Sequence, residues 1–404
     1  MRLHTVNLGC KVNRVETDEA ASLLLGSGFE ESGLPSADVV LVNTCTVTGE
    51  AEKKTRKAVR HALRQNEFAR VVVTGCATAI DADTYLSMDP RVTVVPKFEL
   101  FDYLRENFAT NEGFHSVLRS TDAFRTRVGV KVQDGCDNAC SFCIVHVARG
   151  RATSKPVSVV CDEVAALVES GVKEIVLTGI NLGSYCDLLD GQKTGLADLL
   201  TLLLEQTSHA EGTLPRFRIS SIEPKNVDDA LIDVMAQAEG RICRHLHLPL
   251  QSGSSKVLRE MARPYDAEFF CCLVDKLRAS MPSMALSTDI IAGFPGETEA
   301  DFRETLEVAR RSRFMKIHAF PYSKRTGTPA ARRPDQIDPA IKQERASRLR
   351  QLSEELERLD YSSRVNTVEM ALVEPGNRAT TESYHTVDVS ESYDVGQLVS
   401  YRFN

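Results

Sequence analysis

The sequence predicts an α/β protein in three parts: an N-terminal doubly wound parallel sheet, a central open (β/α)6 barrel, and a small C-terminal β-barrel. Two observations predict this order. Strand-like apolar runs alternate with amphipathic helical patterns over roughly the first 360 residues, and short alternating runs replace them after about Tyr361. With 404 residues and 42% hydrophobic content, the chain is long enough for two or three cores.

Residues 1–112 form the first predicted domain. Its four strand candidates are RLHTVNLG (2–9), ADVVLVNT (37–44), ARVVVTG (69–75) and RVTVV (91–95). A helical pattern follows each run, such as TDEAASLLLGSGF from Thr17 and GEAEKKTRKAVRHALRQ from Gly49. This alternation is typical of a parallel sheet with helices on both faces. The polar stretch over 110–124 is the expected linker.

Residues 122–358 form the second predicted domain, in which six strand-helix units follow one another. The strand candidates are RVGVKVQD (127–134), EIVLTGI (174–180), RFRISSI (216–222), RHLHLPL (244–250), LSTDIIAGF (286–294) and MKIHAF (315–320). Six units are fewer than the eight that close a barrel, so we expect an open one. A charged helix over 340–365 should lie along its outside.

The remaining residues, 361–404, carry the runs VEMALVE, YHTVDVS and GQLVSYRF, separated by turn-forming residues. This pattern predicts a small β-barrel of roughly 40 residues, close to the lower limit for independent stability.

Composition limits the function. A formal net charge of −7 argues against a protein that is basic all over, although local basic patches for a polyanion stay open. The apolar runs are far shorter than the roughly 20 residues of a membrane helix, and the start does not resemble a signal peptide. We therefore expect a cytoplasmic protein without a membrane partner. Eleven cysteines then favour metal or catalytic use over disulfides.

The segment QDGCDNACSFC places Cys136, Cys140 and Cys143 directly after the first barrel strand. Thiolates are the usual ligands of cubane iron-sulfur clusters, and three of them leave one iron open for a small molecule. A structural zinc ion is the rival interpretation, but it requires a fourth ligand, for which His146 is the near candidate.

A second set of cysteines is dispersed along the sequence. Cys10, Cys45 and Cys76 each follow a predicted strand of the first domain. The carboxyl ends of parallel strands share one edge of a sheet, so the three should meet in one crevice. Each also precedes a helical segment, where exposed N–H groups favour a thiolate. Ordinary buried cysteines at strand ends are the alternative.

Polar residues also end the barrel strands, at the face where barrel enzymes carry their chemistry. They are Gly179 and Asn181 in TGIN, Glu223 in SSIEP, Gln251 in LPLQSGS and Asp289 in TDIIAGF. A plain turn at TGIN and a surface position for Glu223 are the alternatives.

Basic residues cluster in spite of the acidic total. Arg149 and Arg151 follow the cysteine loop, and Lys324 and Arg325 follow the sixth strand, so both groups should flank the barrel mouth and contact RNA phosphates. Arg149 and Arg151 could equally contact a cofactor. A third group over 53–60, beside Cys45, could be a solvated helix face.

The motif CxxxCxxC from Cys136 to Cys143 resembles that of the radical S-adenosylmethionine (SAM) enzymes. Together with GCKVN around Cys10, NTCTVT around Cys45 and GC at Cys76, it makes nearly the whole chain similar to the methylthiotransferase family. LGCKVN and QDGCDNACSFCIVHVARGR are most similar to the MtaB subgroup, which modifies threonylcarbamoyladenosine in tRNA.

The resemblance implies two [4Fe-4S] clusters. Cys136, Cys140 and Cys143 would hold the cluster that cleaves SAM. A second triplet, Cys10, Cys45 and Cys76, would hold an auxiliary cluster that carries the sulfur. One SAM would methylate that sulfur, and a second would yield the radical that removes hydrogen from C2 of adenosine 37. A cofactor has to supply this step, because no side-chain base removes such a hydrogen.

Further roles are also implied by the resemblance. The SAM-binding residues would be Phe142, Gly179, Asn181, Glu223, Gln251 and Asp289. The partners would be the tRNA anticodon loop and an electron donor such as flavodoxin or ferredoxin. The tail resembles a TRAM domain but is short and has few basic residues, which leaves two alternatives open: a methylthiotransferase of a ribosomal protein side chain, or an RNA-binding iron-sulfur or zinc protein without radical chemistry.

Overall fold

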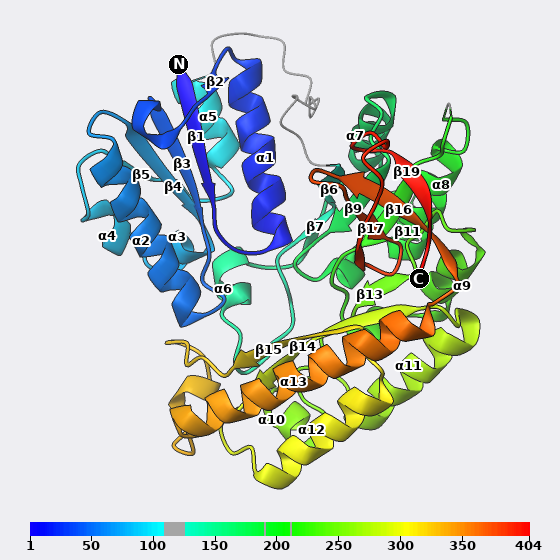
Figure 1. Ribbon diagram of the computed structural model, residues 1–404. Coiled ribbons are helices and arrows are strands. Elements are labelled where there is room, and N and C mark those ends of the chain that lie inside the picture. Colours follow the sequence, from blue (N-terminus) through cyan, green and yellow to red (C-terminus); the bar gives the residue numbers. More distant parts are fainter. Residues whose placement is uncertain (109–125, 190, 211) are drawn as a thin grey trace.

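The computed structural model describes residues 1–108, 126–189, 191–210 and 212–404, whose sheets fall into three groups along the chain (Figure 1). The linker expected over 110–124 lies outside the described residues.

The N-terminal group is one parallel sheet with the strand order β2-β1-β3-β4-β5. Its strands are β1 (Arg2–Asn7), β2 (Glu30–Glu31), β3 (Val39–Thr44), β4 (Arg70–Gly75) and β5 (Val92–Val94). Its helices are α1 (Lys11–Gly26), α2 (Gly49–Gln65), α3 (Cys76–Ile80), α4 (Asp83–Leu86) and α5 (Leu100–Phe108). The chain adds β2 on one side of β1 and then β3 on the other side. A crevice is expected at such a switch point, beyond the ends of the parallel strands β1 and β3.

Successive residues of β3 face opposite sides of this sheet. Leu41 belongs to a buried cluster with α1 and α5, whereas Val40 and Val42 belong to another with α2. Burying each such side chain contributes about 1.5–3 kcal/mol. The doubly wound fold predicted from the sequence is therefore confirmed.

Helix α1 differs from its predicted extent. It begins at Lys11, six residues before the expected Thr17, with Cys10 as an N-cap of extended conformation. Helix α2 has the predicted bounds, because the Thr48 side chain caps it by accepting a hydrogen bond from the Ala51 N–H at 3.1 Å.

The central group contains six parallel strands in chain order. They are β6 (Arg127–Lys131), β9 (Glu174–Thr178), β12 (Arg216–Ile219), β13 (His245–His247), β14 (Ala285–Ala292) and β15 (Lys316–Pro321). The first three and the last three form separate sheets, which parallel bridges at Phe217–Ile242 and Ser221–His247 connect. This sequence of strands agrees with the six predicted units.

Helices connect and cover these strands. They are α6 (Val145–Arg149), α7 (Val157–Glu169), α8 (Leu196–Gln206), α9 (Asp229–Gln237), α10 (Ser255–Glu260), α11 (Ala267–Ser280), α12 (Glu299–Arg311) and α13 (Pro339–Ser363). Two short antiparallel pairs join β7 (Gln133–Asp134) with β8 (Thr153–Ser154), and β10 (Asp187–Leu189) with β11 (Gln192–Thr194). The charged helix α13 buries Leu349, Leu352 and Leu356 and runs beside β14 and β15 (Figure 1).

The C-terminal group is an antiparallel sheet with the order β18-β17-β16-β19. Its strands are β16 (Val368–Glu374), β17 (Arg378–Thr381), β18 (Thr386–Asp388) and β19 (Leu398–Arg402). The outer strands β18 and β19 do not pair with each other in the described part of the chain, so an open sheet stands where we expected a small barrel.

Two buried arginines of β12 attach this sheet to the barrel. Arg218 donates to the carbonyls of Thr381 and Glu382, and Arg216 donates to those of Met370 and Thr380. Both also bind the fully buried carboxylate of Glu174 on β9. Burial alone would raise the pKa of Glu174, but the two guanidinium groups outweigh it and lower that pKa to about 2.

Candidate active site

All six predicted cluster cysteines line one cavity of about 1030 Å³. Cys10, Cys45 and Cys76 enter it from the N-terminal sheet, and Cys136, Cys140 and Cys143 from the loop after β7. The two sets, which lie far apart in the sequence, therefore share one solvent-filled space.

Two glycines bring the N-terminal cysteines together. Gly9 and Gly75, which directly precede Cys10 and Cys76, have φ values of +119° and +103°. A Cβ atom on Gly75 would lie 2.4 Å from Asn43 Oδ1, and one on Gly9 would lie 2.8 Å from Cys45 Cβ. Only glycine fits these turns, so the cysteine loops can approach one another closely.

A buried asparagine ties the same loops together. The Asn13 amide donates to the carbonyls of Leu8 and Thr44 at 3.1 and 2.8 Å. Its Oδ1 accepts from Arg149 Nη2 at 2.7 Å and from the Cys10 thiol at 3.4 Å. One side chain thus connects the ends of β1 and β3 with the central domain.

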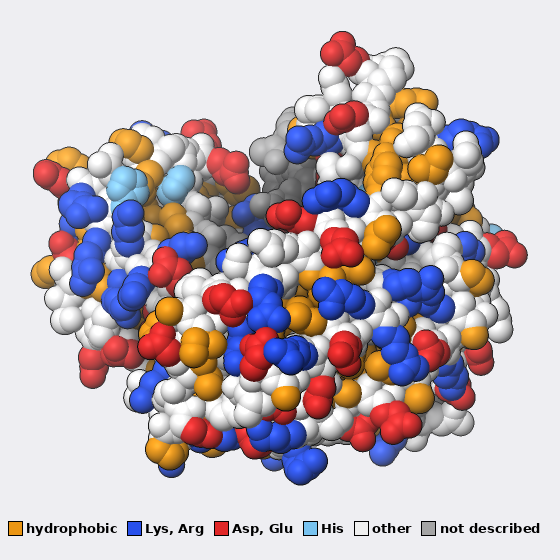
Figure 2. Space-filling view, turned by 60° about the horizontal axis from the view of Figure 1, so that its bottom comes forward, with side chains coloured by type: hydrophobic (Ala, Val, Ile, Leu, Met, Phe, Trp, Pro, Cys, Tyr) orange, Lys and Arg blue, Asp and Glu red, His pale blue; other side chains and the backbone are white. Residues whose placement is uncertain are grey.

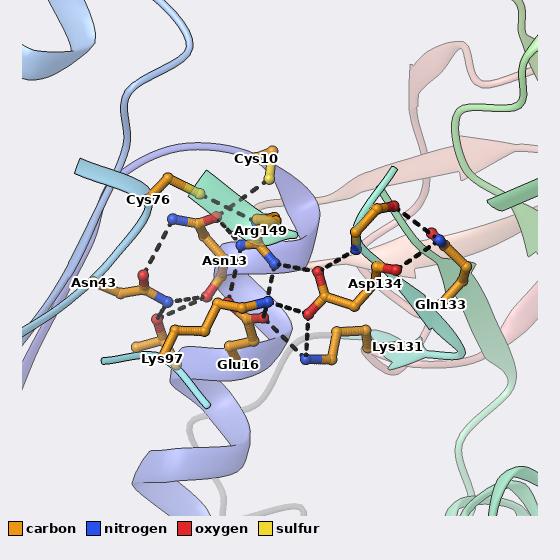
Figure 3. A network of polar contacts seen from close by, with 12 residues as sticks. Cys10, Asn13, Glu16, Asn43, Cys76, Lys97, Lys131, Gln133, Asp134 and Arg149 are labelled. Carbon is orange, nitrogen blue, oxygen red and sulfur yellow. Dashed lines mark hydrogen bonds and ion pairs between the residues drawn. The ribbon is translucent and has the colours of Figure 1, made fainter. Parts of the chain in front are cut away.

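Arg149 is the centre of a polar network around the N-terminal cysteines (Figure 3). Its Nε donates to Cys76 Sγ at 3.1 Å, and its Nη1 donates to Glu16 and Asp134 at 2.9 and 3.0 Å. Burial alone would lower the pKa of Arg149, but Cys76, Glu16 and Asp134 outweigh this effect and raise it. A permanent positive charge therefore lies against a cysteine sulfur.

Two lysines complete this network. Lys131 lies 2.9 Å from Glu16 and 3.2 Å from Asp134, and Lys97 forms an ion pair with Asp134. With Arg149 they make three cations around two carboxylates, which leaves one positive charge beside the thiols. That balance suits an anionic ligand set.

The second cysteine set receives its own donors. The backbone N–H groups of Asn138 and Val145 each lie 3.4 Å from a sulfur, those of Cys136 and Cys143 respectively. Arg263 Nη1 donates to Cys140 Sγ at 3.2 Å. Each cysteine set is thus supported by one buried arginine.

Arg263 is fixed by its other contacts. Its guanidinium forms an ion pair with Glu223 and donates to the Tyr265 hydroxyl at 2.8 Å. Glu223 also lies 3.4 Å from the Asn138 amide nitrogen. The carboxylate predicted at the end of β12 is therefore a buried partner of the cysteine loop, not a surface group.

The donor set fits iron-sulfur clusters better than one zinc ion. Among the described residues, a single group has the compact spacing of a one-ion site, and it contains neither cysteine set. Burial raises the pKa of both Cys45 and Cys143 to about 11, so a thiolate there needs a metal to stabilise it. Three cysteines on each side would leave one iron of each cubane open.

The predicted SAM-binding residues reach the same cavity: Phe142, Gly179, Asn181, Glu223, Gln251 and Asp289. Gly179 packs so closely that an added Cβ would lie 2.9 Å from Gln133 Oε1, which itself accepts from the Asn181 N–H at 2.8 Å. The buried Asn181 Oδ1 has no partner in the described part of the chain. A buried acceptor of this kind is suited to a ligand donor.

The RNA contacts predicted for Arg149 and Arg325 need correction. The Arg149 side chain is 0% exposed and bound to carboxylates. Arg325 is buried as well, where it donates to Thr46 Oγ1 at 2.6 Å and forms an ion pair with Glu52. Both guanidinium groups join the first domain to the second and are not available to phosphates. Arg151 and Lys324, by contrast, are exposed.

Several residues of the site carried no signal in the sequence. Glu16 and Arg263 belong to no recognisable local motif, and Arg263 lies 123 positions from the cysteine that it contacts. Asn13 ends the LGCKVN stretch, but that motif did not indicate its hydrogen bonds. His247, at the end of β13, and His318, within β15, also line the cavity. Only the position of His247 at a strand end could have indicated it.

Within the described residues, no helix is both long and apolar enough to cross a bilayer.

Two protein families match the chain. The Radical SAM superfamily matches residues 130–309, which contain β9 to β14, and the uncharacterized protein family UPF0004 matches residues 2–96, which contain the N-terminal sheet. Each family thus covers one of the two cysteine sets.

Curated relatives extend over nearly the full length. The threonylcarbamoyladenosine tRNA methylthiotransferase MtaB of Bacillus subtilis is 38% identical over 96% of this chain and 88% of its own. The protein of the same name from Chlamydia pneumoniae is 36% identical over 99% and 94%. A tRNA-2-methylthio-N(6)-dimethylallyladenosine synthase of Parafrankia sp. is 38% identical over 92% and 77%.

Solved structures share the fold. The radical SAM methyltransferase TsrM from Kitasatospora setae superimposes with a TM-score of 0.58 at 16% identity, over 82% of this chain and 77% of its own. The fold, the two cysteine sets and the full-length relatives agree: this chain belongs to the radical SAM methylthiotransferase family.

Proposed function

We propose that this protein transfers a methylthio group to C2 of threonylcarbamoyladenosine at position 37 of tRNA, using two [4Fe-4S] clusters and SAM. The observation that carries the proposal is that both incomplete cysteine sets line one cavity. A reaction that joins sulfur to an unactivated carbon needs a radical source and a sulfur source at one substrate, and two clusters with open irons would supply them.

The chain's own residues bind and orient. Cys136, Cys140 and Cys143 would hold one cluster, with Arg263 and two backbone N–H groups directed at their sulfurs. Cys10, Cys45 and Cys76 would hold the other, with Arg149 and Asn13 around them. The free Asn181 Oδ1 and the carboxylate of Glu223 are suited to the donor groups of SAM, whereas the Asp289 carboxylate lies 3.3 Å from the His247 ring.

The names of the relatives favour tRNA over a ribosomal protein as substrate, because the two named MtaB are called threonylcarbamoyladenosine tRNA methylthiotransferases. Exposed basic side chains gather on the lobe formed by the N-terminal sheet (Figure 2). They include Lys53, Lys54, Lys57 and Arg60 on α2, which begins four residues after Cys45. Together with Arg151 and Lys324, this face would hold the phosphates of the anticodon arm.

The remaining assignments follow from the same activity. An electron donor such as flavodoxin or ferredoxin would reduce the clusters, and the tRNA substrate would place the protein in the cytoplasm.

A deletion strain tests the proposal. Its tRNA should lose the methylthio group from threonylcarbamoyladenosine, and the wild-type gene should restore it, whereas a gene with Cys45→Ala should not. Mass spectrometry of tRNA nucleosides and of ribosomal proteins from one culture measures the methylthio group on both candidate substrates. Unchanged nucleosides together with a ribosomal protein lacking the methylthio mass would overturn the tRNA assignment.

Reconstitution tests the cofactor count independently. About eight irons and eight sulfides per chain are expected from two cubanes, and about four should remain after Cys10, Cys45 and Cys76 are replaced by alanine. One bound zinc without sulfide would contradict the whole proposal.

A further inference from the structure

The cavity contains a group of polar side chains, apart from the cysteines and their arginines, that the chemistry described above does not use. His247 ends β13, while Asp289 and His318 lie within the neighbouring strands β14 and β15, and their ligand atoms are all within 4.8 Å of one another. All three line the same cavity as both cysteine sets.

His247 serves as an internal support in this group. Its Nδ1 lies 3.0 Å from Ser287 Oγ, and its Nε2 lies 3.3 Å from Asp289 Oδ2. With both ring nitrogens engaged, His247 has no lone pair left for a metal ion. The group is therefore arranged for hydrogen bonding, although its spacing would also fit a single cation.

His318 and Asp289 present free polar atoms. The His318 ring contacts the His247 ring, with centroids 5.7 Å apart, and its nitrogens have no hydrogen-bond partner within the described residues. Asp289 uses one carboxylate oxygen for His247. Burial is the main cause that lowers the pKa of His318, so this ring is neutral and offers one donor and one acceptor.

A cation from the N-terminal domain lines the same cavity. Lys11, next to Cys10, lines the cavity, and its ammonium lies 5.2 Å from the centre of the Tyr384 ring of the C-terminal sheet. No carboxylate in the described ranges forms an ion pair with it. Lys11 is also close enough to His318 to lower the pKa of that histidine. All three domains thus contribute to this part of the cavity.

We infer that Lys11, Asp289 and His318 form a subsite for a carboxylate-bearing, hydrogen-bonding substituent on N6 of the target adenosine. The inference rests on the proposed function and specifies its substrate. A base whose reacting carbon lies between the cysteine sets has its substituent in the same cavity. A threonylcarbamoyl group would offer a carboxylate to Lys11 and His318 and a hydroxyl to Asp289. A dimethylallyl hydrocarbon would offer no hydrogen bond to His318, to the Lys11 ammonium or to the remaining oxygen of Asp289, which disfavours its binding.

The distinction matters within this family. Relatives of similar identity are named for threonylcarbamoyladenosine and for dimethylallyladenosine, so overall likeness does not identify the substituent. The polar side chains of this subsite identify the substituent, because they can form hydrogen bonds with a threonylcarbamoyl group but not with a dimethylallyl group.

Binding of anticodon stem-loop RNAs by the reconstituted, SAM-loaded protein tests the inference. Three RNAs are compared, with adenosine, threonylcarbamoyladenosine or dimethylallyladenosine at position 37. The wild-type protein should bind the threonylcarbamoyl RNA most tightly. Lys11→Met and His318→Phe should each weaken that binding about tenfold, the value of one charge-assisted hydrogen bond, and change binding of the unmodified RNA less than twofold.

Lys193 is an exposed lysine in the β10–β11 hairpin, and Lys193→Met is the matched control. It should leave the binding of all three RNAs unchanged. Iron content and the cluster absorption spectrum of each variant exclude a folding defect. Equal preference for the threonylcarbamoyl RNA in wild type, Lys11→Met and His318→Phe would overturn the subsite while leaving the proposed function intact. A wild-type protein that prefers the dimethylallyl RNA would instead overturn both.

Discussion

Arg149 Nε lies 3.1 Å from Cys76 Sγ, although the arginine belongs to the radical SAM domain and the cysteine to the N-terminal sheet. The pair joins helix α6, which follows the CxxxCxxC loop, to the cysteine set of the other domain. Arg263 has the equivalent contact with Cys140 in the second set. The two contacts predict separable effects on two clusters.

We expect Arg149→Gln to lower the reduction potential of the auxiliary cluster. Reduction adds negative charge, which a donated hydrogen bond and a nearby cation stabilise. One charge-assisted hydrogen bond is worth about 1.5–3 kcal/mol, so the shift of this one-electron couple should be about 65–130 mV. The measurement is an EPR redox titration in a protein whose Cys136, Cys140 and Cys143 are alanines.

We expect Arg263→Gln to lower the potential of the SAM-binding cluster by a similar amount. The titration uses a protein whose Cys10, Cys45 and Cys76 are alanines, so that one cluster remains. Each arginine is the control for the other, because Arg149→Gln should leave this potential unchanged. If Arg149→Gln and Arg263→Gln shifted the reduction potential of the same cluster by equal amounts, the effect would be a general loss of folding. That result would contradict the two assignments.

Gly75→Ala should remove the auxiliary cluster. An added Cβ would lie 2.4 Å from Asn43 Oδ1 and 2.6 Å from the Thr44 carbonyl oxygen, so the turn before Cys76 has to move. Iron content should fall from about eight to about four per chain. Gly376→Ala is the matched control, because its φ of +82° is also positive but no atom lies within 4 Å of the added Cβ.

Glu174→Gln should destabilise the protein by about 3–5 kcal/mol, because it leaves Arg216 and Arg218 buried with less compensating charge. The measurement is urea unfolding followed by circular dichroism. Asp229→Asn, which removes an exposed ion pair with Lys276, should cost less than about 1 kcal/mol. Similar losses of unfolding free energy in Glu174→Gln and Asp229→Asn would contradict the view that burial makes the loss of the Glu174 charge more costly.

The same carboxylate predicts a pH dependence. Its pKa is lowered from an ordinary value of 4.5 to about 2 in the folded protein. The stability that it contributes is therefore complete above about pH 4.5 and decreases as the pH falls towards 2, because the unfolded chain takes up the proton more readily. Unfolding curves between pH 3 and 6 should show this decrease in the wild type and a weaker one in Glu174→Gln.

The sequence was informative where a general rule links a position in the sequence to a location in the fold. Cys10, Cys45 and Cys76 could be placed together because parallel strands end at one edge of a sheet, and the strands themselves have regular apolar patterns. Strand β17, with the sequence RATT, escaped notice because four residues are too few for a visible alternation. The start of α1 was also missed, since Cys10 caps it without a side-chain hydrogen bond.

The surroundings of the cysteines could not be predicted in this way. A basic side chain near a strand end reads equally well as a phosphate ligand or as a buried cation, and only the fold decides between them. For Arg149 and Arg325 the deciding fact is burial against Glu16 and Glu52, which lie 133 and 273 positions away. No local pattern reports contacts over such separations.

The contact between Arg149 and Glu16 also limits how these enzymes can be recombined. A chimera that takes its first 108 residues from a relative keeps the cysteines of the auxiliary set but brings its own residues at positions 13 and 16. Unless the residues at these two positions can bind Arg149 beside Asp134 of the recipient, the buried guanidinium group loses hydrogen-bond partners at the junction between the two domains. The N-terminal domain therefore has to be exchanged together with helix α6 rather than as an independent module.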